Sequence, residues 1–414
     1  MTKRALLIAF HFPPQAASSG IQRTLSFSKN LGNYGWEPMV LSAHPRAYSQ
    51  QNPSQLASVP AGLVVRRVFA LDTKRHLGIK GRYLEALALP DRWVSWSLGA
   101  VPAGLSLIRR YKPQVIWSTF PISTAHLIGL ALHRLTGLPW VADFRDPMLQ
   151  ASYPASAIQR KFYQWIEHQA ITRCHTAVFT THSALADYQR RFPAIDHAKF
   201  RVIENGYDED GFDPGSFVAP APAQQRRLTL LHSGVLYSTG RDPSPFLQAV
   251  AALKRQGHAS AATLRVVLRA PGDMEAIGKR VREIGVEDIV EVAPPVPYRD
   301  ALKEMLAADG LMVFQGTPFN TQVPAKIYEY FRARKPIIGL VDPSGETARV
   351  LGVAGFHDLA DMNSAVAIQP VLQSFIEKMA KGDATIASDE LIQSSSRKYR
   401  ASELAGIFDG ATTA

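Results

Sequence analysis

The chain has 414 residues, more than one hydrophobic core usually organises, so two domains are expected. Apolar residues make up 46% and charged residues 20%, as in folded globular proteins, and no apolar run approaches the roughly 18 residues of a membrane span. The net charge of +11 favours an anionic partner, and the lone Cys174 together with unclustered histidines argues against an internal disulfide or a structural zinc site.

Apolar, β-rich segments alternate with helical patterns through the first half of the chain. Strands are predicted at 5–10, 38–42, 63–70, 114–119, 140–144, 176–181 and 200–203. Helices are predicted at 20–34, 97–111, 123–135 and 158–173. The run at 5–10 imitates a signal peptide, but it ends at His11 without a small-residue cleavage site, so we interpret it as a strand.

A second series of the same kind follows a segment rich in Pro and Ala. Strands are predicted at 228–233, 264–269, 289–292, 311–314 and 336–341, with helices at 244–256, 274–284, 298–308 and 324–333. Such alternation indicates parallel βαβ units. The sequence therefore predicts an α/β fold of two doubly wound domains, 1–212 and 228–388, joined by a linker at 213–227. Ligands of such sheets bind beyond the strand carboxyl ends, so a cleft between the two facing domains is the expected site.

A basic segment with aromatic residues lies at 66–96. It contains Arg66, Arg67, Lys74, Arg75, His76, Lys80 and Arg82 against Asp72, followed by Tyr83, Leu84, Leu87, Leu89, Trp93 and Trp96. This composition suits peripheral contact with an anionic membrane. The alternative is a solvated loop with two core tryptophans. Nucleic acid is not an expected partner, because no recognised binding module is present.

The predicted helix at 324–333 carries the clearest chemical pattern. A helix N-terminus attracts anions, and Lys326 beside it adds a point charge suited to phosphate. Glu329, one turn later, can accept hydrogen bonds from a diol. Together these features could hold a nucleoside diphosphate by its phosphates and its ribose.

Five segments in chain order resemble the retaining family 4 glycosyltransferases of the GT-B fold, of the type that builds bacterial glycans and exopolysaccharides. These segments are 12–14 with 19–20, 137–147, 204–208 with Phe212, 230–236, and 324–330 with 335–338. The resemblance covers nearly the whole chain. It implies two Rossmann-like domains, with the acceptor on the N-terminal domain and the nucleotide sugar on the C-terminal one. A final helix near 389–408, within 389–414, would cross back to the first domain.

The resemblance also implies roles for residues on the donor side. Glu329 would hold the donor ribose, or it is an exposed helix Glu paired with Lys326 or an Arg. Arg241 and Lys326 would stabilise the leaving diphosphate; the alternatives are a solvated loop arginine and an i,i+3 salt bridge. The remaining candidates for donor contact are Gly20, Gly234, Gln322 and Val323, and Gly20 could equally form a plain N-cap turn. The family's second carboxylate is missing, since Thr321 stands at its position.

On the acceptor side, Arg145 and Asp146 end a predicted strand. Asp146 could act as general base, or the two form a structural ion pair. The histidine that the family often has after 114–119 is absent, and His126 is interpreted as a core residue. The segment Asp208-Glu209-Asp210 spells Asp-x-Asp but lies in the connector, so no metal and no other cofactor is expected.

The predicted function is therefore a hexosyltransferase-type enzyme in the cytoplasm, peripheral at the inner face of the cytoplasmic membrane. It would transfer a sugar from a nucleotide diphosphate sugar to a glycan or lipid-linked glycan, with retention and without a metal. Two alternatives stay open: a nucleotide-sugar epimerase of the same fold, and a non-catalytic glycosyltransferase-like partner protein.

Overall fold

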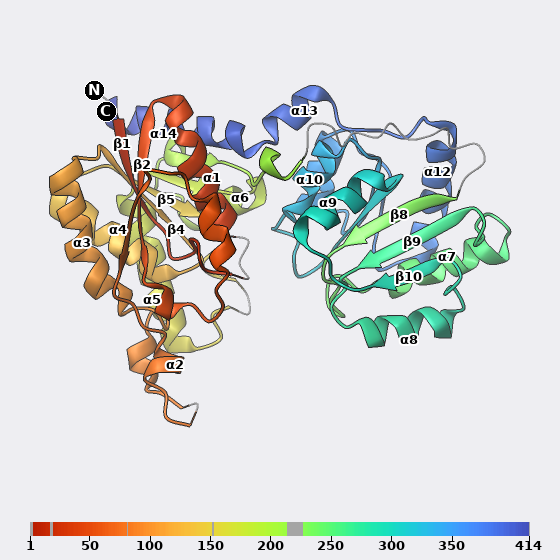
Figure 1. The fold of residues 1–414 in the computed structure, drawn as a ribbon, viewed down its shortest axis with the longest axis horizontal. Coiled ribbons are helices and arrows are strands. Elements are labelled where there is room, and N and C mark those ends of the chain that lie inside the picture. The colour runs from red at the N-terminus through yellow and green to blue at the C-terminus, as the bar shows by residue number, and fades with distance from the viewer. Residues whose placement is uncertain (1–2, 17–19, 81, 151–152, 213–226, 414) are drawn as a thin grey trace. The chain divides into compact units, whose positions relative to one another are not determined.

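The computed structural model describes residues 3–16, 20–80, 82–150, 153–212 and 227–413. These residues form two compact units, shown in Figure 1. The N-terminal unit comprises residues 1–205 and 397–414, and the C-terminal unit comprises residues 206–396. The predicted linker lies almost entirely outside the described residues.

The described part of the N-terminal unit contains a seven-stranded parallel sheet of order β3-β2-β1-β4-β5-β6-β7. Its strands are β1 (Lys3–Ile8), β2 (Trp36–Ala43), β3 (Val64–Val68), β4 (Val115–Thr119), β5 (Trp140–Phe144), β6 (Thr176–Phe179) and β7 (Phe200–Val202). Along β1, Leu6 and Ile8 enter one core while Ala5 and Leu7 enter the other. Both sheet faces are buried, which explains why these strands read as continuous apolar runs.

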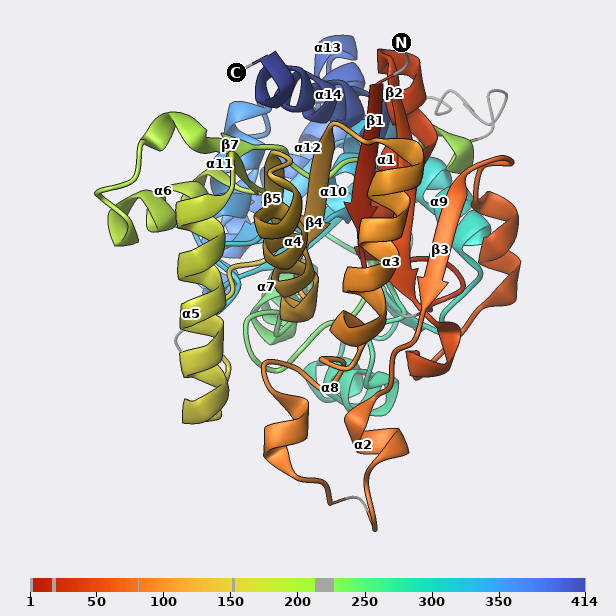
Figure 2. The ribbon, with the colours of Figure 1, turned by 90° about the vertical axis from the view of Figure 1, so that its left-hand side faces the viewer.

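Helices cover both faces of this sheet. They are α1 (Gly20–Asn30), α3 (Trp96–Tyr111), α4 (Ser123–Thr136), α5 (Ala157–Arg173), α6 (His182–Arg191) and α14 (Arg397–Thr413), whereas the short α2 (Thr73–His76) lies away from the sheet (Figure 2). Short 3-10 helices of this unit span Leu31–Tyr34, Pro45–Ala47, Pro53–Ser58, Glu85–Ala88 and His197–Lys199, and a further one, Glu209–Gly211, belongs to the C-terminal unit. The core with α3, α4 and α5 lies on one face, and the core with α1 and α14 lies on the other. In the second core, Phe408 of α14 packs edge-on against Trp36.

The C-terminal unit has a six-stranded parallel sheet within its described residues, of order β10-β9-β8-β11-β12-β13. The strands are β8 (Leu228–Ser233), β9 (Leu264–Arg269), β10 (Val290–Ala293), β11 (Gly310–Gln315), β12 (Ile337–Val341) and β13 (Leu359–Ala360). The helices are α7 (Ser244–Arg255), α8 (Met274–Ile284), α9 (Tyr298–Ala307), α10 (Lys326–Arg332), α11 (Glu346–Val353), α12 (Ala365–Lys381) and α13 (Asp389–Ser394). Helices α7, α8 and α12 pack in one hydrophobic core, and α9, α10 and α11 pack in the other.

The strand order reverses between β1 and β4 in one sheet and between β8 and β11 in the other. Ligands of doubly wound sheets bind at the carboxyl ends of the strands at such a switch point. The fold therefore marks one candidate site in each unit.

The structure corrects several sequence-based boundaries. The helix expected near 389–408 is two helices, of which α13 belongs to the C-terminal unit and α14 to the N-terminal unit. The division between the units falls after Asn205 rather than after residue 212. Helix α10 begins at Lys326 and has seven residues, fewer than predicted. None of the helices in the described residues is long and apolar enough to cross a membrane.

Candidate functional site

Lys326 lies at the switch point of the C-terminal sheet. As the first residue of α10, it reaches back to the end of β8, where its Nζ donates a hydrogen bond to the carbonyl oxygen of Ser233 at 2.6 Å. A Cβ on Gly234 would lie 2.6 Å from this Nζ, and Gly234 has a φ of +132°, which L residues rarely adopt. Glycine is therefore required here both for space and for backbone conformation.

A second cation, Arg241, lies near Lys326. Its Nε donates to Oε1 of Gln315 at 2.9 Å, and its Cζ lies 4.9 Å from the ring centre of Phe319 and 5.5 Å from that of Tyr237. Burial lowers the pKa of Arg241. Burial, together with the positive charge of Arg241, lowers the pKa of Lys326 to about 7, and Glu329 opposes part of the shift. Because Lys326 and Arg241 repel each other, a bound dianion would stabilise the charged form of both side chains.

The loop 316–324 is shaped by two residues that the sequence analysis missed. Gln315, at the end of β11, donates from Nε2 to the carbonyl oxygen of Phe319 at 3.2 Å. Asp342, just after β12, accepts from Thr317 Oγ1 at 3.0 Å and from Asn320 Nδ2 at 2.8 Å. These and other hydrogen bonds hold the pKa of Asp342 below its ordinary value. Both are polar residues at the carboxyl end of a strand, which is the sequence signal that could have identified them.

The two loops at the switch point also contact each other directly. Gly240 has a φ of +76°, and a Cβ there would lie 2.6 Å from the carbonyl oxygen of Thr317. The amide of Gly316 donates to the carbonyl oxygen of Gly240 at 2.9 Å. This contact brings Arg241 to the loop that carries Gln322 and Val323. Val323 itself is buried in the core below the loop.

Glu329 lies on the partly exposed side of α10, one turn after Lys326. Its Oε1 accepts a hydrogen bond from the hydroxyl of Tyr298 on α9 at 2.9 Å. Thr321 is exposed on the loop before the helix. The structure thus brings Gly234, Arg241, Lys326 and Glu329 into one neighbourhood of the C-terminal unit.

The N-terminal unit gathers Gly20, Arg145 and Asp146 at its own switch point. Arg145 forms an ion pair with Asp146, with 2.9 Å between Nη2 and Oδ2. A Cβ on Gly20 would clash with Arg145 Nη1, so a larger residue at the start of α1 would displace the Arg145 guanidinium. Arg145 Nη1 is buried and has no hydrogen-bond partner among the described residues. A buried donor without a partner indicates a place for an acceptor atom of a ligand.

His11 is a site residue that sequence reasoning missed. It lines a small cavity of about 10 Å³ with Gly20, Thr119, Phe120 and Arg145. Burial lowers the pKa of His11 to about 3, helped by the charge of Arg145, so the imidazole is neutral near pH 7. Its place directly after a predicted strand was the signal that could have found it.

Beneath this site, two buried polar groups hold the framework. Arg23 of α1 forms an ion pair with Asp143 of β5, with Nη2–Oδ1 and Nε–Oδ2 distances of 2.7 and 3.0 Å, and donates to the carbonyl oxygen of Ile203 at 3.1 Å. His126 is buried, with Nδ1 2.8 Å from Ser118 Oγ. The interpretation of His126 as a core residue is confirmed.

The Asp-x-Asp segment is used within the protein. Asp208 caps a 3-10 turn by accepting from the amide of Asp210, and Glu209 forms an ion pair with Arg332. Over the part of the chain that the structure describes, no group of three or more His, Cys, Asp or Glu side chains is placed to hold a metal ion.

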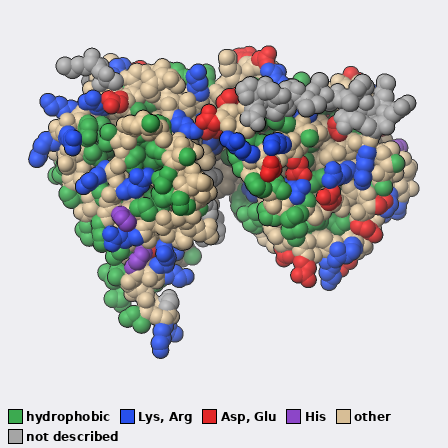
Figure 3. Space-filling model, viewed as in Figure 1, with side chains coloured by type: hydrophobic (Ala, Val, Ile, Leu, Met, Phe, Trp, Pro, Cys, Tyr) green, Lys and Arg blue, Asp and Glu red, His purple; other side chains and the backbone are tan. Residues whose placement is uncertain are grey.

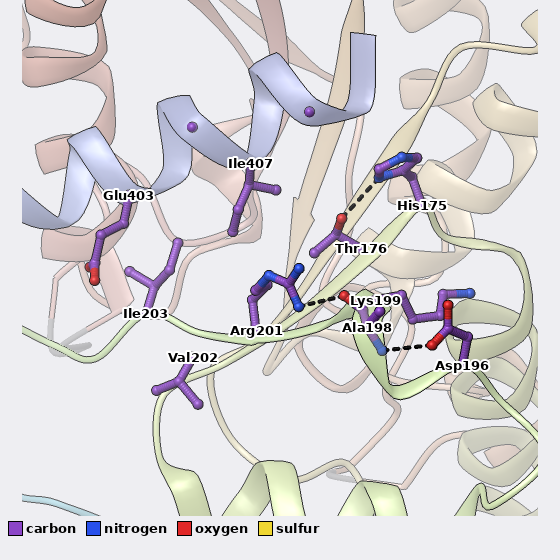
Figure 4. Close-up of a pocket in the computed structure, with 12 residues that line it drawn as sticks. His175, Thr176, Asp196, Ala198, Lys199, Arg201, Val202, Ile203, Glu403 and Ile407 are labelled. Atoms are coloured by element: carbon purple, nitrogen blue, oxygen red, sulfur yellow. Dashed lines mark hydrogen bonds between the residues drawn. The ribbon is translucent and has the colours of Figure 1, made fainter. Parts of the chain in front are cut away.

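The N-terminal unit also contains a larger hollow of about 620 Å³ away from these residues (Figure 4). It lies beside the edge strand β7 and α14, where Gly406 and Gly410 leave room. Its basic side chains already bind backbone: Lys199 Nζ donates to the carbonyl oxygen of Ile171, and Arg201 to that of Ala198. None of the predicted site residues lines it.

Comparison with known proteins supports the assignment of the fold. Residues 20–206 match the family model described as a glycosyl transferase 4-like domain. The chain has the GT-B fold. A search of curated proteins returned no significant match.

Three solved GT-B-like structures illustrate the similarity. Sucrose-phosphate synthase from Thermosynechococcus elongatus is 14% identical, with a TM-score of 0.62 over 99% of each chain. HepE from Anabaena in complex with UDP is 12% identical, with a TM-score of 0.61 over 99% of this chain and 97% of that one. A putative UDP-N-acetylglucosamine 2-epimerase from Listeria monocytogenes is 12% identical, with a TM-score of 0.57 over 99% of this chain and 96% of that one. The prediction of two Rossmann-like domains is confirmed.

Proposed function

We propose that the protein is a glycosyltransferase that takes a sugar from a nucleotide diphosphate sugar and transfers it to a hydroxyl of a glycan or lipid-linked glycan. The observation that carries this proposal is the pair of cations Lys326 and Arg241 beside Gly234 and Glu329 at a GT-B switch point. The glycosyl transferase 4-like match of the N-terminal unit and a neighbour with bound UDP support it.

In this proposal each residue has a defined task. Lys326 and Arg241 bind the diphosphate and stabilise the negative charge that grows on it as the glycosidic bond breaks. Glu329 accepts hydrogen bonds from the ribose hydroxyls. The two side-chain cations supply the charge that a metal ion supplies in other transferases, so we propose a metal-independent reaction. We further propose that the anomeric configuration is retained.

On the acceptor side, Arg145 and the neutral His11 offer hydrogen bonds to substrate oxygens. Asp146 would accept the proton of the attacking hydroxyl, and its ion pair with Arg145 keeps the carboxylate oriented. We place the enzyme in the cytoplasm, at the inner face of the cytoplasmic membrane.

A screen of nucleotide sugars tests the proposal. Incubation with a membrane glycolipid extract should release nucleoside diphosphate from one donor, and the release should depend on the extract. Lys326→Met should abolish it, whereas Lys279→Met on the exposed face of α8 should not. Extract-dependent release from none of the donors would contradict the proposal.

The epimerase is the second candidate, because a putative 2-epimerase shares the fold at a TM-score of 0.57. An epimerase needs no acceptor. This alternative would be established if the protein converts a nucleotide sugar to its epimer in the absence of extract, as detected by NMR of the sugar protons.

A further inference from the structure

We propose that the N-terminal unit binds an anionic membrane through an exposed apolar surface formed by residues 77–80 and 82–87 together with the first turns of α5. The inference gives a location to the proposed activity, but its test measures vesicle binding. Failure of either proposal therefore leaves the other intact.

Helix α5 is apolar on two opposite faces. Its inner face buries Tyr163 and Ile166 in the core. Its outer face carries Ile158, Phe162 and Trp165 at the i, i+4 and i+7 positions, with exposed fractions of 52%, 43% and 46%. A surface helix of a globular protein normally presents polar residues outward, so this outer stripe indicates a binding surface.

The segment after α2 adds further exposed apolar side chains. Ile79, Leu84 and Leu87 are 79%, 73% and 47% exposed. The base of the segment is held firmly: Thr73 Oγ1 donates to the carbonyl oxygen of Leu87 at 2.9 Å, and the buried carboxylate of Asp91 accepts from Ser123 Oγ at 2.7 Å. The apolar tip is therefore presented by an anchored segment.

The two parts form one continuous surface. Glu85 accepts a hydrogen bond from Ser156 Oγ, at the N-cap of α5, at 2.5 Å. Gln159 Nε2 of α5 donates to the carbonyl oxygen of Pro90 at 2.9 Å. Figure 2 shows α2 with its following segment and the start of α5 extending toward the same end of the N-terminal unit.

Charge favours an anionic lipid surface as the occupant. Lys74, Arg75, Lys80, Arg82 and Lys161 are exposed around the apolar side chains. Among the described residues of 72–92, Glu85 is the exposed acid, and it is bonded to Ser156. Figure 3 shows basic side chains beside apolar ones at the tip of the segment that follows α2. A second copy of the chain would bring like charges together, whereas an anionic bilayer matches both the charge and the apolar groups.

This surface differs from the membrane contact that the sequence suggests at 66–96. Trp96 is fully buried, and Trp93 donates from Nε1 to the carbonyl oxygen of Ala47. Arg67 binds the carbonyl oxygen of Pro13. The interfacial tryptophan is instead Trp165, which lies outside that range.

Co-sedimentation of the full chain with vesicles tests the inference. Vesicles of equal parts phosphatidylglycerol and phosphatidylcholine should bind the protein, and pure phosphatidylcholine should bind it far more weakly. Ile79→Ser with Leu84→Ser should weaken binding by at least roughly tenfold, and Lys80→Gln with Arg82→Gln by roughly tenfold or more. The matched control, Val353→Ser with Val366→Ser, changes side chains that are 78% and 84% exposed in the C-terminal unit and should bind as the wild type does.

Three outcomes would overturn the inference. The wild type fails to bind anionic vesicles, or the Ile79 and Leu84 variant binds them as tightly as the wild type. The third outcome is that light scattering finds a wild-type dimer in solution, that the Ile79 and Leu84 variant is monomeric, and that vesicles leave the dimer unchanged. The surface would then be an interface between two copies of the protein.

Discussion

At the scale of single residues, the proposed donor site depends on the ammonium group of Lys326, which is buried beside a second cation. Lys326 is held against Ser233 and beside Arg241, and its pKa falls to about 7. A charge that is costly in the free protein becomes favourable when an anion arrives. In the proposed function, the site would therefore bind a diphosphate and take up a proton as it does so.

The first prediction concerns pH. Below about pH 7 Lys326 is charged, and above it the free protein increasingly holds neutral lysine. Affinity for a nucleoside diphosphate should therefore fall as pH rises from 7 to 9, by up to about tenfold per unit. Calorimetry in buffers of different ionisation enthalpy should show proton uptake on binding. Lys326→Met should remove the slope, and an equally steep slope in that variant would contradict the assignment.

The second prediction concerns Glu329. Its replacement by Ala should weaken donor binding by about 1.5–3 kcal/mol, because hydrogen bonds to the ribose involve a charged acceptor. Tyr298→Phe removes the hydrogen bond that the Tyr298 hydroxyl donates to Glu329 and serves as a control for local disturbance. Calorimetric affinities of folded variants give the readout. If Glu329→Ala binds like the wild type, Glu329 does not hold the ribose.

At the scale of elements, glycines let two loops and a helix meet at one switch point. Gly234 makes room for Lys326, and Gly240 makes room for the loop after β11. The third prediction follows: Gly234→Ala should lower stability by about 1–3 kcal/mol through strain at positive φ and should weaken nucleotide binding.

The matched control is Gly352→Ala on α11, where an added Cβ would meet nothing within 4 Å. That variant should be neutral or more stable by up to about 1 kcal/mol, because alanine favours the helix. Urea unfolding of both variants compares them. Equal effects would show that Gly234 makes no special contribution.

The fourth prediction concerns the ion pair that joins α1 to β5. Arg23→Ala should lower the free energy of unfolding by about 3–5 kcal/mol, since it leaves Asp143 charged and buried without its partner. Arg23→Met with Asp143→Leu should recover part of this loss. The exposed Arg66→Ala should change stability by less than about 0.5 kcal/mol. Urea titration measures all three, and a small effect of Arg23→Ala would refute the structural role.

The strands and most helices of both sheets could be predicted because buried parallel strands leave unbroken apolar runs, such as 140–144 and 264–269. Strand β13 was missed because it has two residues, too few for a pattern. The sequence predicts a single helix at 389–408 because residues 395–396, where the two helices separate, contain no Pro or Gly to signal a break. The proximity of Lys326 to Glu329 could be predicted because the two residues are one helical turn apart. The contact of Lys326 with Ser233 could not be predicted, because the two residues are 93 positions apart in the sequence.

At the scale of the whole molecule, each unit places polar residues at the switch point of its sheet. The C-terminal unit gathers the cations that we propose for diphosphate binding. The N-terminal unit brings together His11, Asp146 and Arg145, whose Nη1 has no hydrogen-bond partner among the described residues. This division of labour suits a reaction with two substrates. It also separates two kinds of effect: variants at Lys326 should change donor affinity, and variants at Asp146 should change transfer.

The fifth prediction uses that separation. Asp146→Asn should leave nucleoside diphosphate affinity within about twofold of the wild type and lower the rate of transfer by about 10²–10⁴-fold, the usual contribution of a general base. Calorimetry and acceptor-dependent product formation give the two readouts. A loss of nucleotide affinity in this variant would mean that Asp146 acts on the donor instead.

The most direct test of the account is calorimetric titration of the full chain with UDP, GDP, ADP and TDP, in parallel with Lys326→Met and Lys279→Met. One diphosphate should bind to the wild type and to the Lys279 variant with equal affinity, and the Lys326 variant should bind it far more weakly. Absence of binding by all four, or binding that survives Lys326→Met unchanged, would contradict a nucleoside diphosphate site at the end of β8.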